Sequence, residues 1–287
     1  MSDLPDISFP NLGIHIDHLS REAFSIFGVS IYWYALIIMT GFVTALLLAR
    51  RKAKQIGQDP ELYSDFFIWT IICGILGARA YYVIFSWDSY KSDPARILNF
   101  REGGLAIYGG IIAVFFAAVV FTRVKKVNFL AFCDVCAPCL AAAQAIGRWG
   151  NFVNREVFGG WSDGLLAMRY KAEQVSVIPP SVAARAFESG GVSYIQVQPT
   201  FLYESLWNAF VFAALTLLAR KKRFDGQVLF LYFIGYGTGR FYIEGIRTDQ
   251  LFLGNTELPV SQVVSAALIV LSVAGLIVVG KSSKKTY

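Results

Sequence analysis

The chain has 287 residues, of which 55% are hydrophobic and 16% are charged, and its formal net charge is +6 at pH 7. Its apolar residues stand in long blocks and do not follow a helical or strand period, which is typical of a membrane protein and argues against a soluble domain. We attribute the positive charge to membrane orientation and to anionic headgroups. No nucleic-acid partner is expected.

Taken in chain order, the residues before Val29 mix charges and prolines and show no cleavage pattern after an apolar core. We therefore expect no removable signal peptide. Seven apolar blocks follow, each long enough to cross a bilayer as a helix. They cover residues 29–49, 64–85, 105–121, 129–146, 201–219, 228–246 and 260–279. The sequence thus predicts an all-α polytopic membrane protein with seven transmembrane helices.

Basic residues gather in every second connection, and lysine and arginine accumulate in short cytoplasmic loops. The dense set is Arg50, Arg51, Lys52, Lys54, Arg123, Lys125, Lys126, Arg220, Lys221, Lys222, Arg223, Lys281, Lys284 and Lys285. The alternate connections mix their basic residues with Asp88, Asp93 and Glu102. This pattern predicts an N-terminus outside and a C-terminus in the cytoplasm. We expect one domain over residues 1–287, with a small outer cap at about 160–199.

With this orientation, the polar residues of the predicted helices fall in their outer halves. They are Tyr32 and Tyr34 in the first helix, Arg79 in the second, Tyr108 in the third, Arg148 and Asn151 in the fourth, Tyr203 and Glu204 in the fifth, and Arg240 and Glu244 in the sixth. An arginine in hydrocarbon is costly, so it normally faces the protein interior or water and meets an anion. The sequence therefore predicts an anion-handling site at one membrane surface.

The sixth predicted helix carries a polar stripe, because Tyr236, Arg240 and Glu244 are spaced by four and Arg247 follows three later. The alternative to a functional stripe is an intrahelical ion pair that only lets the arginine be buried. The three glycines between Gly235 and Gly239 favour close helix packing, with a ligand approaching the backbone as the alternative.

Three cysteines, Cys133, Cys136 and Cys139, are spaced like metal ligands. We interpret them as a stripe of small buried hydrophobic residues, because no fourth ligand is evident. We expect no metal ion and no cofactor.

The segment from Gly147 to Gly159 reads GRWGNFVNREVFG. It resembles the motif G-R-x-G-N-F-x-N-x-E-x-x-G of the prolipoprotein diacylglyceryl transferase family. Further matches follow the family order at YWY (32–34), GARAYY (77–82), Asp134, Ala137 with Pro138, PTFLYE (199–204), and the segment from Gly235 through Arg240 to Glu244. The resemblance covers nearly the whole chain.

This resemblance implies an enzyme of the bacterial cytoplasmic membrane with its active site toward the outer leaflet. It implies transfer of the diacylglyceryl group of phosphatidylglycerol to the lipobox cysteine thiol in the signal peptide of a prolipoprotein. A thioether forms and glycerol phosphate leaves, in the first step of lipoprotein maturation. The partners it implies are phosphatidylglycerol, the prolipoprotein and membrane lipids.

The resemblance also implies residue roles. Arg148 and Arg240 are expected to hold the phosphate, with Glu244 orienting Arg240. The expected substrate-binding residues are Tyr34, Arg79, Asn151, Asn154, Glu156, Tyr203, Glu204 and Tyr236. Tyr108 and Gln198 stand where many family members have histidine. We therefore expect Tyr108 to donate a hydrogen bond, and proton removal to depend on the arginine field, a carboxylate or water.

Two other functions stay open at this point. A transporter or channel for an anionic solute also uses buried arginines and glycine-interrupted helices. Its path needs polar residues on both sides, whereas the inner halves here are nearly apolar apart from Asp65 and Asp134. A lipid-binding scaffold needs the same anion site but no access for a peptide thiol. The distribution favours the transferase.

Overall fold

The structure is a computed structural model that describes residues 4–100, 103–254 and 256–283. Glu102, Lys284 and Lys285, which entered the orientation prediction, lie outside these residues. The chain divides into two compact units, Met1–Ala45 with Ala137–Tyr287, and Leu46–Cys136. Each is described by itself, and the single domain over the whole chain stays a prediction.

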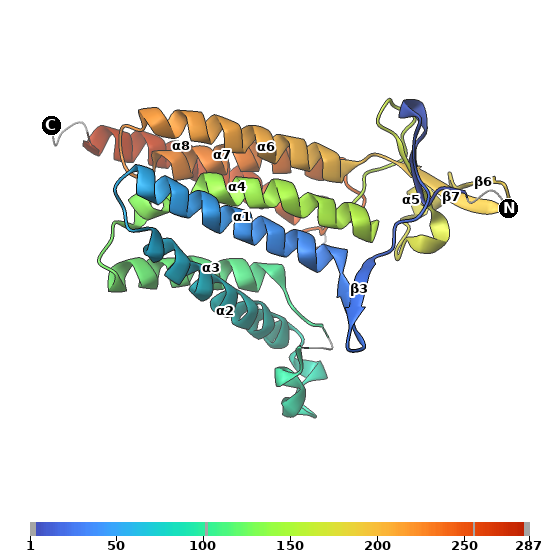
Figure 1. Ribbon diagram of the computed structural model, residues 1–287, viewed down its shortest axis with the longest axis horizontal. Helices are drawn as coiled ribbons and strands as arrows, with labels where there is room; N and C mark the ends of the chain where they lie inside the picture. Colours follow the sequence, from blue (N-terminus) through green and yellow to red (C-terminus); the bar gives the residue numbers. More distant parts are fainter. Residues whose placement is uncertain (1–3, 101–102, 255, 284–287) are drawn as a thin grey trace. The chain divides into compact units, whose positions relative to one another are not determined.

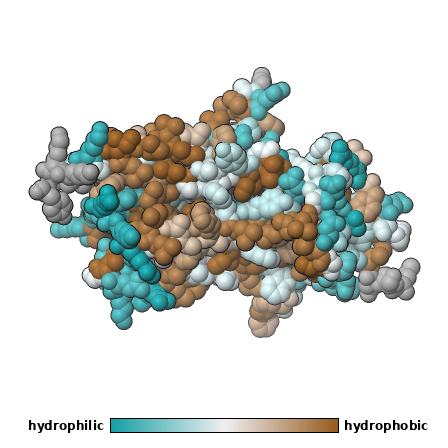
Figure 2. Space-filling model, turned by 90° about the horizontal axis from the view of Figure 1, so that it is seen from above, coloured by the Kyte–Doolittle hydropathy of each residue, from teal (hydrophilic) through white to brown (hydrophobic). Residues whose placement is uncertain are grey.

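A long helix overlaps each of the seven predicted apolar blocks (Figure 1). The helices are α1 (Trp33–Gln55), α2 (Pro60–Phe85), α3 (Ile107–Val124), α4 (Phe129–Asn154), α6 (Thr200–Leu218), α7 (Gln227–Glu244) and α8 (Val260–Ser283). Among the described residues, six are long and apolar enough to cross a membrane, and α7 falls short. Hydrophobic residues cover much of the helical surface visible in Figure 2. The protein is a polytopic helical membrane protein.

The first helix begins later than predicted, because residues 29–32 form a strand. Strand β4 (Val29–Tyr32) pairs antiparallel with β3 (Glu22–Ile26), and Tyr32 lies opposite Glu22. The turn residues Phe27 and Gly28 both have positive φ, 49° and 79°, as a tight two-residue hairpin turn requires. The prediction that Tyr32 lies in the first helix is therefore wrong, because apolar length alone did not separate the β-branched hairpin from the helix.

The cap is larger than the predicted loop and consists mainly of β-sheet. It is a five-stranded sheet in the order β2-β1-β5-β7-β6, antiparallel throughout. The strands are β1 (Ile7–Phe9), β2 (Ile14–Ile16), β5 (Met168–Lys171), β6 (Phe187–Ser189) and β7 (Val192–Val197), with the short helix α5 (Pro180–Ala183) beside them. Thus the all-α prediction fails in the cap, where the N-terminal segment adds two strands too short to show a period.

Short 3₁₀ turns complete the described structure. They are η1 (Pro10–Leu12), η2 (Trp87–Ser89), η3 (Pro94–Leu98), η5 (Ala172–Gln174) and η6 (Ala219–Lys221).

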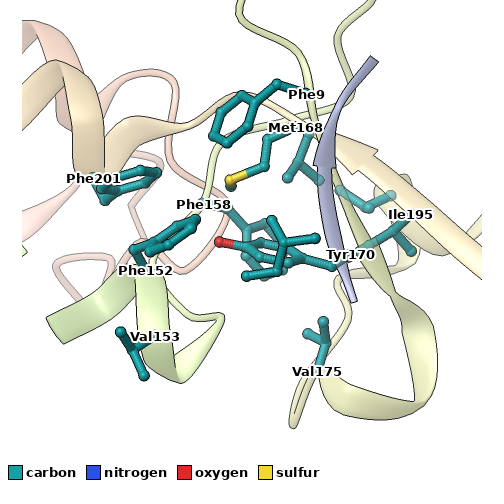
Figure 3. Packing of buried hydrophobic residues seen from close by; sticks show 12 residues of the cluster. Phe9, Phe152, Val153, Phe158, Met168, Tyr170, Val175, Ile195 and Phe201 are labelled. Atoms are coloured by element: carbon teal, nitrogen blue, oxygen red, sulfur yellow. The ribbon is translucent and has the colours of Figure 1, made fainter. Parts of the chain in front are cut away.

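The sheet packs directly onto two helix ends (Figure 3). Phe152 from α4 and Phe201 from α6 pack together with their ring centroids 4.6 Å apart, and both belong to the same buried cluster as Met168, Tyr170 and Ile195 of the sheet. Fully buried aromatic and aliphatic side chains give such a contact most of its stability. The cap therefore fixes where α4 ends and where α6 begins.

Glycines let α7 approach its two neighbours in the first unit. A Cβ on Gly239 would lie 2.1 Å from the Trp207 ring of α6, and one on Gly237 would lie 3.0 Å from Ile269 of α8. Trp207 also donates its indole N–H to the Gly235 carbonyl at 2.8 Å. For these glycines the packing interpretation is confirmed.

Replacing Gly239 with alanine is expected to lower the thermal unfolding midpoint, because the new methyl group overlaps the Trp207 ring. Such overpacking costs about 1–3 kcal/mol. The matched control is Gly160→Ala, since a Cβ there meets nothing within 4 Å. Thermal unfolding of both variants in detergent measures the difference, and equal midpoints would contradict the close α6–α7 contact.

Glycines also bring α2 and α3 together in the second unit. A Cβ on Gly77 would lie 2.2 Å from the Ala113 side chain and 2.7 Å from the Gly109 carbonyl oxygen. These helices therefore pack backbone to backbone at this level.

Candidate functional site

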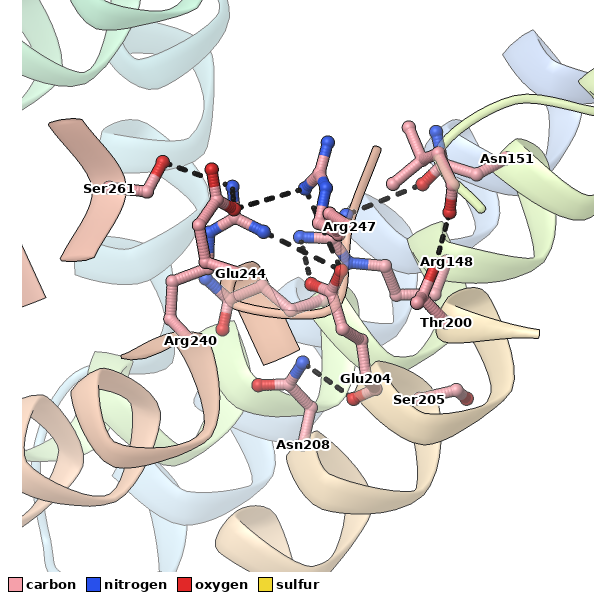
Figure 4. Close-up of polar contacts among 12 residues, drawn as sticks. Arg148, Asn151, Thr200, Glu204, Ser205, Asn208, Arg240, Glu244, Arg247 and Ser261 are labelled. Carbon is pink, nitrogen blue, oxygen red and sulfur yellow. Dashed lines mark hydrogen bonds and ion pairs between the residues drawn. The ribbon is translucent and has the colours of Figure 1, made fainter. Parts of the chain in front are cut away.

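The first unit brings three arginines and two glutamates together where α4, α6 and α7 meet (Figure 4). Arg148 Nη2 lies 2.7 Å from Glu204 Oε2, and Arg240 Nη2 lies 2.6 Å from Glu244 Oε2. Arg247, just after α7, places its Nη1 3.7 Å from Glu204 Oε1 and 3.8 Å from Glu244 Oε2. We call these five residues the arginine–glutamate cluster.

The cluster is buried, and its charges are paired. The side chains of Glu204 and Glu244 are 3% and 2% exposed, and those of the three arginines are 10–19% exposed. With Asp249, which lies 2.6 Å from Arg247, three guanidiniums face three carboxylates, so the charges are balanced, as buried charges normally are.

Asp249 lies at the edge of the cluster and is half exposed. It accepts two hydrogen bonds from Arg247, at 2.9 Å from Nε and 2.6 Å from Nη2. Burial alone would raise the pKa of Asp249, but these bonds outweigh it and lower the pKa. This bidentate contact fixes the plane of the Arg247 guanidinium and leaves its Nη1 facing the two glutamates.

One hydrogen-bond donor in the cluster has no acceptor. Arg240 Nη1 is buried and finds no hydrogen-bond acceptor among the described residues. It lies 3.5 Å from Glu204 Oε1, an ion-pair contact that lacks hydrogen-bond geometry, while Nη2 reaches Ser261 Oγ at 3.1 Å. Leaving a buried donor unsatisfied costs roughly 1–3 kcal/mol. Glu204 Oε1 and Glu244 Oε2 also have no hydrogen-bond donor among the described residues, so a ligand with an anionic oxygen and a hydroxyl group would complement the cluster.

The end of α4 carries a second set of predicted residues. Asn151 accepts from Arg148 Nη1 at 3.4 Å and donates to Glu156 Oε1 at 2.9 Å, and Asn154 donates to the same oxygen at 3.3 Å. Hydrogen bonds therefore link Arg148 to Glu156 through an amide. The predicted residues Arg148, Asn151, Asn154 and Glu156 do lie together.

A left-handed turn makes this arrangement possible. Arg155 has φ of 55°, and the Glu156 N–H reaches back to the Asn151 carbonyl at 3.1 Å, which is the six-to-one bond of a Schellman cap. Val157 also has positive φ, 58°, which is strained for a β-branched residue. Strain of this kind persists where the surroundings impose it, and it is common at functional sites.

The two glycines that flank this turn are required by close contacts. A Cβ on Gly150 would lie 2.8 Å from the Tyr34 ring, so Tyr34 of α1 lies against the last turns of α4. A Cβ on Gly159 would lie 2.9 Å from the Ile246 carbonyl oxygen, and Gly159 forms a bridge with Arg247. The second glycine therefore helps to place Arg247 in the cluster.

Two other predicted tyrosines, Tyr203 and Tyr236, lie on α6 and α7. Tyr236 is one turn before Arg240 and stacks on Tyr232, with the ring centroids 5.7 Å apart. Tyr203 precedes Glu204 and is half-buried. Their substrate-binding roles stay predictions.

Arg79 and Tyr108 belong to the second unit. All three guanidinium nitrogens of the buried Arg79 donate to backbone carbonyls, with Nε to Ile97 (2.9 Å), Nη1 to Gly103 (2.6 Å) and Gly104 (3.1 Å), and Nη2 to Arg96 (2.6 Å) and Asn99 (3.0 Å). This arginine therefore organises the connection between α2 and α3. Its predicted role in substrate binding, like the hydrogen bond predicted for Tyr108 at the start of α3, stays a prediction.

Sequence reasoning missed three contributors to the first unit's site. Arg247 was placed on the α7 stripe but not among the candidates, although its spacing from Glu244 signalled the contact. Ser261 gave no signal, because it reaches Arg240 from another helix. Arg155 is buried and binds the N-terminal segment, donating to the Leu19 carbonyl at 2.6 Å and lying 3.6 Å from Asp6.

Asp6 anchors this N-terminal segment beneath the sheet. Its carboxylate accepts from the Leu19 N–H at 3.1 Å, from Gln174 at 2.8 Å and from Lys171 at 2.9 Å. Burial raises the pKa of Asp6, but these hydrogen bonds together lower it below the usual value. The contact couples the N-terminus to the turn that holds Glu156.

Asp6→Asn is expected to lower the unfolding midpoint near neutral pH, because it removes the charge that Lys171 and Arg155 face. A carboxyl whose folded pKa is depressed stabilises the fold above its unfolded pKa of about 3.9 and loses that contribution as the pH falls through the folded value. The difference in midpoint between the wild type and the variant should therefore shrink as the pH falls below about 4. A difference that stayed constant across this range would contradict the ionic role.

The geometry defines a class of protein: a multi-pass helical membrane protein with a buried arginine–carboxylate cluster near the helix ends that pack against a small sheet. Comparison with known proteins agrees with this and is more specific. The family model for prolipoprotein diacylglyceryl transferase matches residues 21–278. The chain belongs to the prolipoprotein diacylglyceryl transferase family and is a transferase.

Relatives resemble the chain over nearly their full length. Phosphatidylglycerol–prolipoprotein diacylglyceryl transferase of Listeria innocua is 43% identical, over 93% of this chain and 92% of the relative. The Clostridium novyi protein of the same name is 42% identical over 93% and 97%, and that of Clostridioides difficile is 36% identical over 93% and 98%. The resemblance drawn from the sequence motifs is confirmed.

Proposed function

We propose that this chain transfers the diacylglyceryl group of phosphatidylglycerol to the lipobox cysteine thiol of prolipoproteins in the bacterial cytoplasmic membrane. The names of its relatives support the reaction. The observation that supports it in this chain is the arginine–glutamate cluster, which is buried, gathers three guanidiniums and leaves the Arg240 Nη1 donor without a hydrogen-bond acceptor.

The reaction fits the charges of the cluster. The thiol sulfur forms a bond to the carbon of the diacylated glycerol that carries the phosphate. The bond between this carbon and the phosphate oxygen breaks, and its electron pair goes to that oxygen of the departing glycerol phosphate. The phosphate gains negative charge in this step. Arg148 and Arg240 stabilise that charge with preorganised donors, while Glu204 and Glu244 hold the guanidiniums in place.

The thiol proton goes to a carboxylate or to water. The positive field of the arginines favours the thiolate, which is the attacking species. Asn151, Asn154 and Glu156 lie at the flank of Arg148 and are suited to bind the headgroup. No step in this scheme uses a metal ion.

In the membrane, we propose seven spans, with α7 as the span that carries the site. The N-terminus and cap are outside, the C-terminus is in the cytoplasm and the site lies toward the outer leaflet. The alternation of basic connections supports this orientation. The apolar shortfall of α7 has a physical cause, because its last turns carry Arg240 and Glu244, which pair with each other inside the protein.

The test uses purified protein with phosphatidylglycerol and a lipobox peptide, with mass spectrometry of the peptide. We expect a mass increase equal to one diacylglyceryl group, and none when the peptide cysteine is replaced by serine. Folded protein that gives no mass increase, but carries an anionic solute across vesicles, would support the transporter instead.

A further inference from the structure

A β-hairpin stands at the start of α1 and its base is fixed at two points. The Trp33 N–H, in the first turn of α1, donates to the Arg21 carbonyl at 3.0 Å. The Arg21 side chain in turn donates to the Gln174 carbonyl of the cap at 2.6 Å. The hairpin of β3 and β4 is therefore held in a defined direction from both the helix and the cap.

The tip of this hairpin is apolar and exposed. Phe24, Ile26, Phe27 and Val29 are 47%, 50%, 103% and 62% exposed. No charged residue occurs between Glu22 and the end of the hairpin at Tyr32. A contiguous apolar surface of this kind is unfavourable in water and marks a site that contacts a partner or a membrane.

The direction in which the hairpin projects indicates that its exposed tip contacts the membrane. It projects sideways from the start of α1 instead of continuing along the helix axis (Figure 1). Because α1 is long and apolar enough to cross the membrane, a sideways projection at its end runs along the bilayer surface. Tyr32, Trp33 and Tyr34 lie at this same level, and such rings favour the boundary between headgroups and acyl chains. The exposed surface is thus continuous with the lipid-facing surface of α1.

We propose that the β3–β4 hairpin is a membrane-interface anchor that inserts Ile26, Phe27 and Val29 among the lipid headgroups. Pairing of the two strands satisfies most of the hairpin's backbone groups, which makes entry into this region less costly. The anchor sets the depth of the start of α1. Since Tyr34 packs against Gly150, it also sets the depth of the turn that ends α4.

The experiment places a nitroxide spin label at the tip, using Phe27→Cys in a chain whose four native cysteines are replaced by alanine. In phospholipid nanodiscs, we expect the label to collide more with oxygen than with a water-soluble nickel chelate. The matched control is Leu12→Cys, an apolar cap residue that is 42% exposed and should show the reverse preference. Equal nickel accessibility at positions 27 and 12 would overturn the proposal.

A second measurement needs no substitution. The wild-type protein is reconstituted with a phospholipid that carries a photoreactive diazirine near the top of its acyl chain, and adducts are located by mass spectrometry. We expect adducts on residues 24–31 and none on Leu12. Adducts confined to the long helices would equally overturn the anchor. Neither measurement depends on transfer activity.

Discussion

Replacing Arg148 or Arg240 with alanine is expected to lower kcat for diacylglyceryl transfer by a factor of about 10²–10³, the usual effect of removing one preorganised donor to a developing negative charge. Each change also removes the closest partner of a buried carboxylate, since Arg148 lies 2.7 Å from Glu204 and Arg240 lies 2.6 Å from Glu244. The measurement is the initial rate of peptide modification at saturating phosphatidylglycerol.

The matched control is Arg185→Ala. Arg185 is exposed and lies over the Trp161 ring in the cap, 4.6 Å from its centroid, so its loss should leave the rate nearly unchanged. Lysine at position 148 or 240 should restore only part of the activity, because a single ammonium cannot reproduce the forked contacts of a guanidinium. Full transfer by a folded Arg148→Ala protein would exclude it from the reaction.

The long helices were predictable because membrane spans depend on local apolar length. The same signal failed at the start of α1, where Val29 and Ile31 are as apolar in a strand as in a helix. The Phe27–Gly28 turn was the available signal, since a glycine after an apolar run permits a tight hairpin. The cap was missed for another reason: β1 pairs with β5 across more than half the chain, and no local pattern encodes that pairing.

The site was predictable in part. Spacing by four on α7 correctly placed Arg240 beside Glu244. The contacts of Glu204 with Arg148, Arg240 and Arg247 could not be predicted in the same way, because they depend on how three helices pack. Arg155 stands in the same motif as Arg148, yet the left-handed turn directs it to Asp6 and Leu19, a contact that no local spacing predicts.

Glu204→Gln is expected to have the largest effect on stability, because this one carboxylate faces all three arginines of the cluster and is 3% exposed. With Asp249 counted as the partner of Arg247, the change leaves three guanidiniums against two carboxylates, which raises the net charge from zero to one. Removing one partner of a buried ion pair costs about 3–5 kcal/mol. Thermal unfolding in detergent measures the loss.

The control is Glu61→Gln. Glu61 also lies 2.6 Å from an arginine, Arg50, but its side chain is 63% exposed, and exposed pairs contribute only about 0–1 kcal/mol. Its unfolding midpoint should therefore stay close to that of the wild type. If Glu61→Gln and Glu204→Gln lowered the unfolding midpoint equally, burial would not make the ion pairs of the cluster more stabilising than an exposed pair.

A second substitution separates charge balance from packing. Arg247→Met in the Glu204→Gln protein returns the net charge, with Asp249 counted, to zero, so it should recover part of the lost midpoint, whereas Arg247→Met alone should lower it. Such opposite effects define a coupling between the two residues, which lie 3.7 Å apart. If the two losses simply add, Glu204 stabilises the helices through its packing and not as the counter-ion of Arg247. Recovery in the double variant would instead identify charge balance with Arg247 as the contribution of Glu204 to stability.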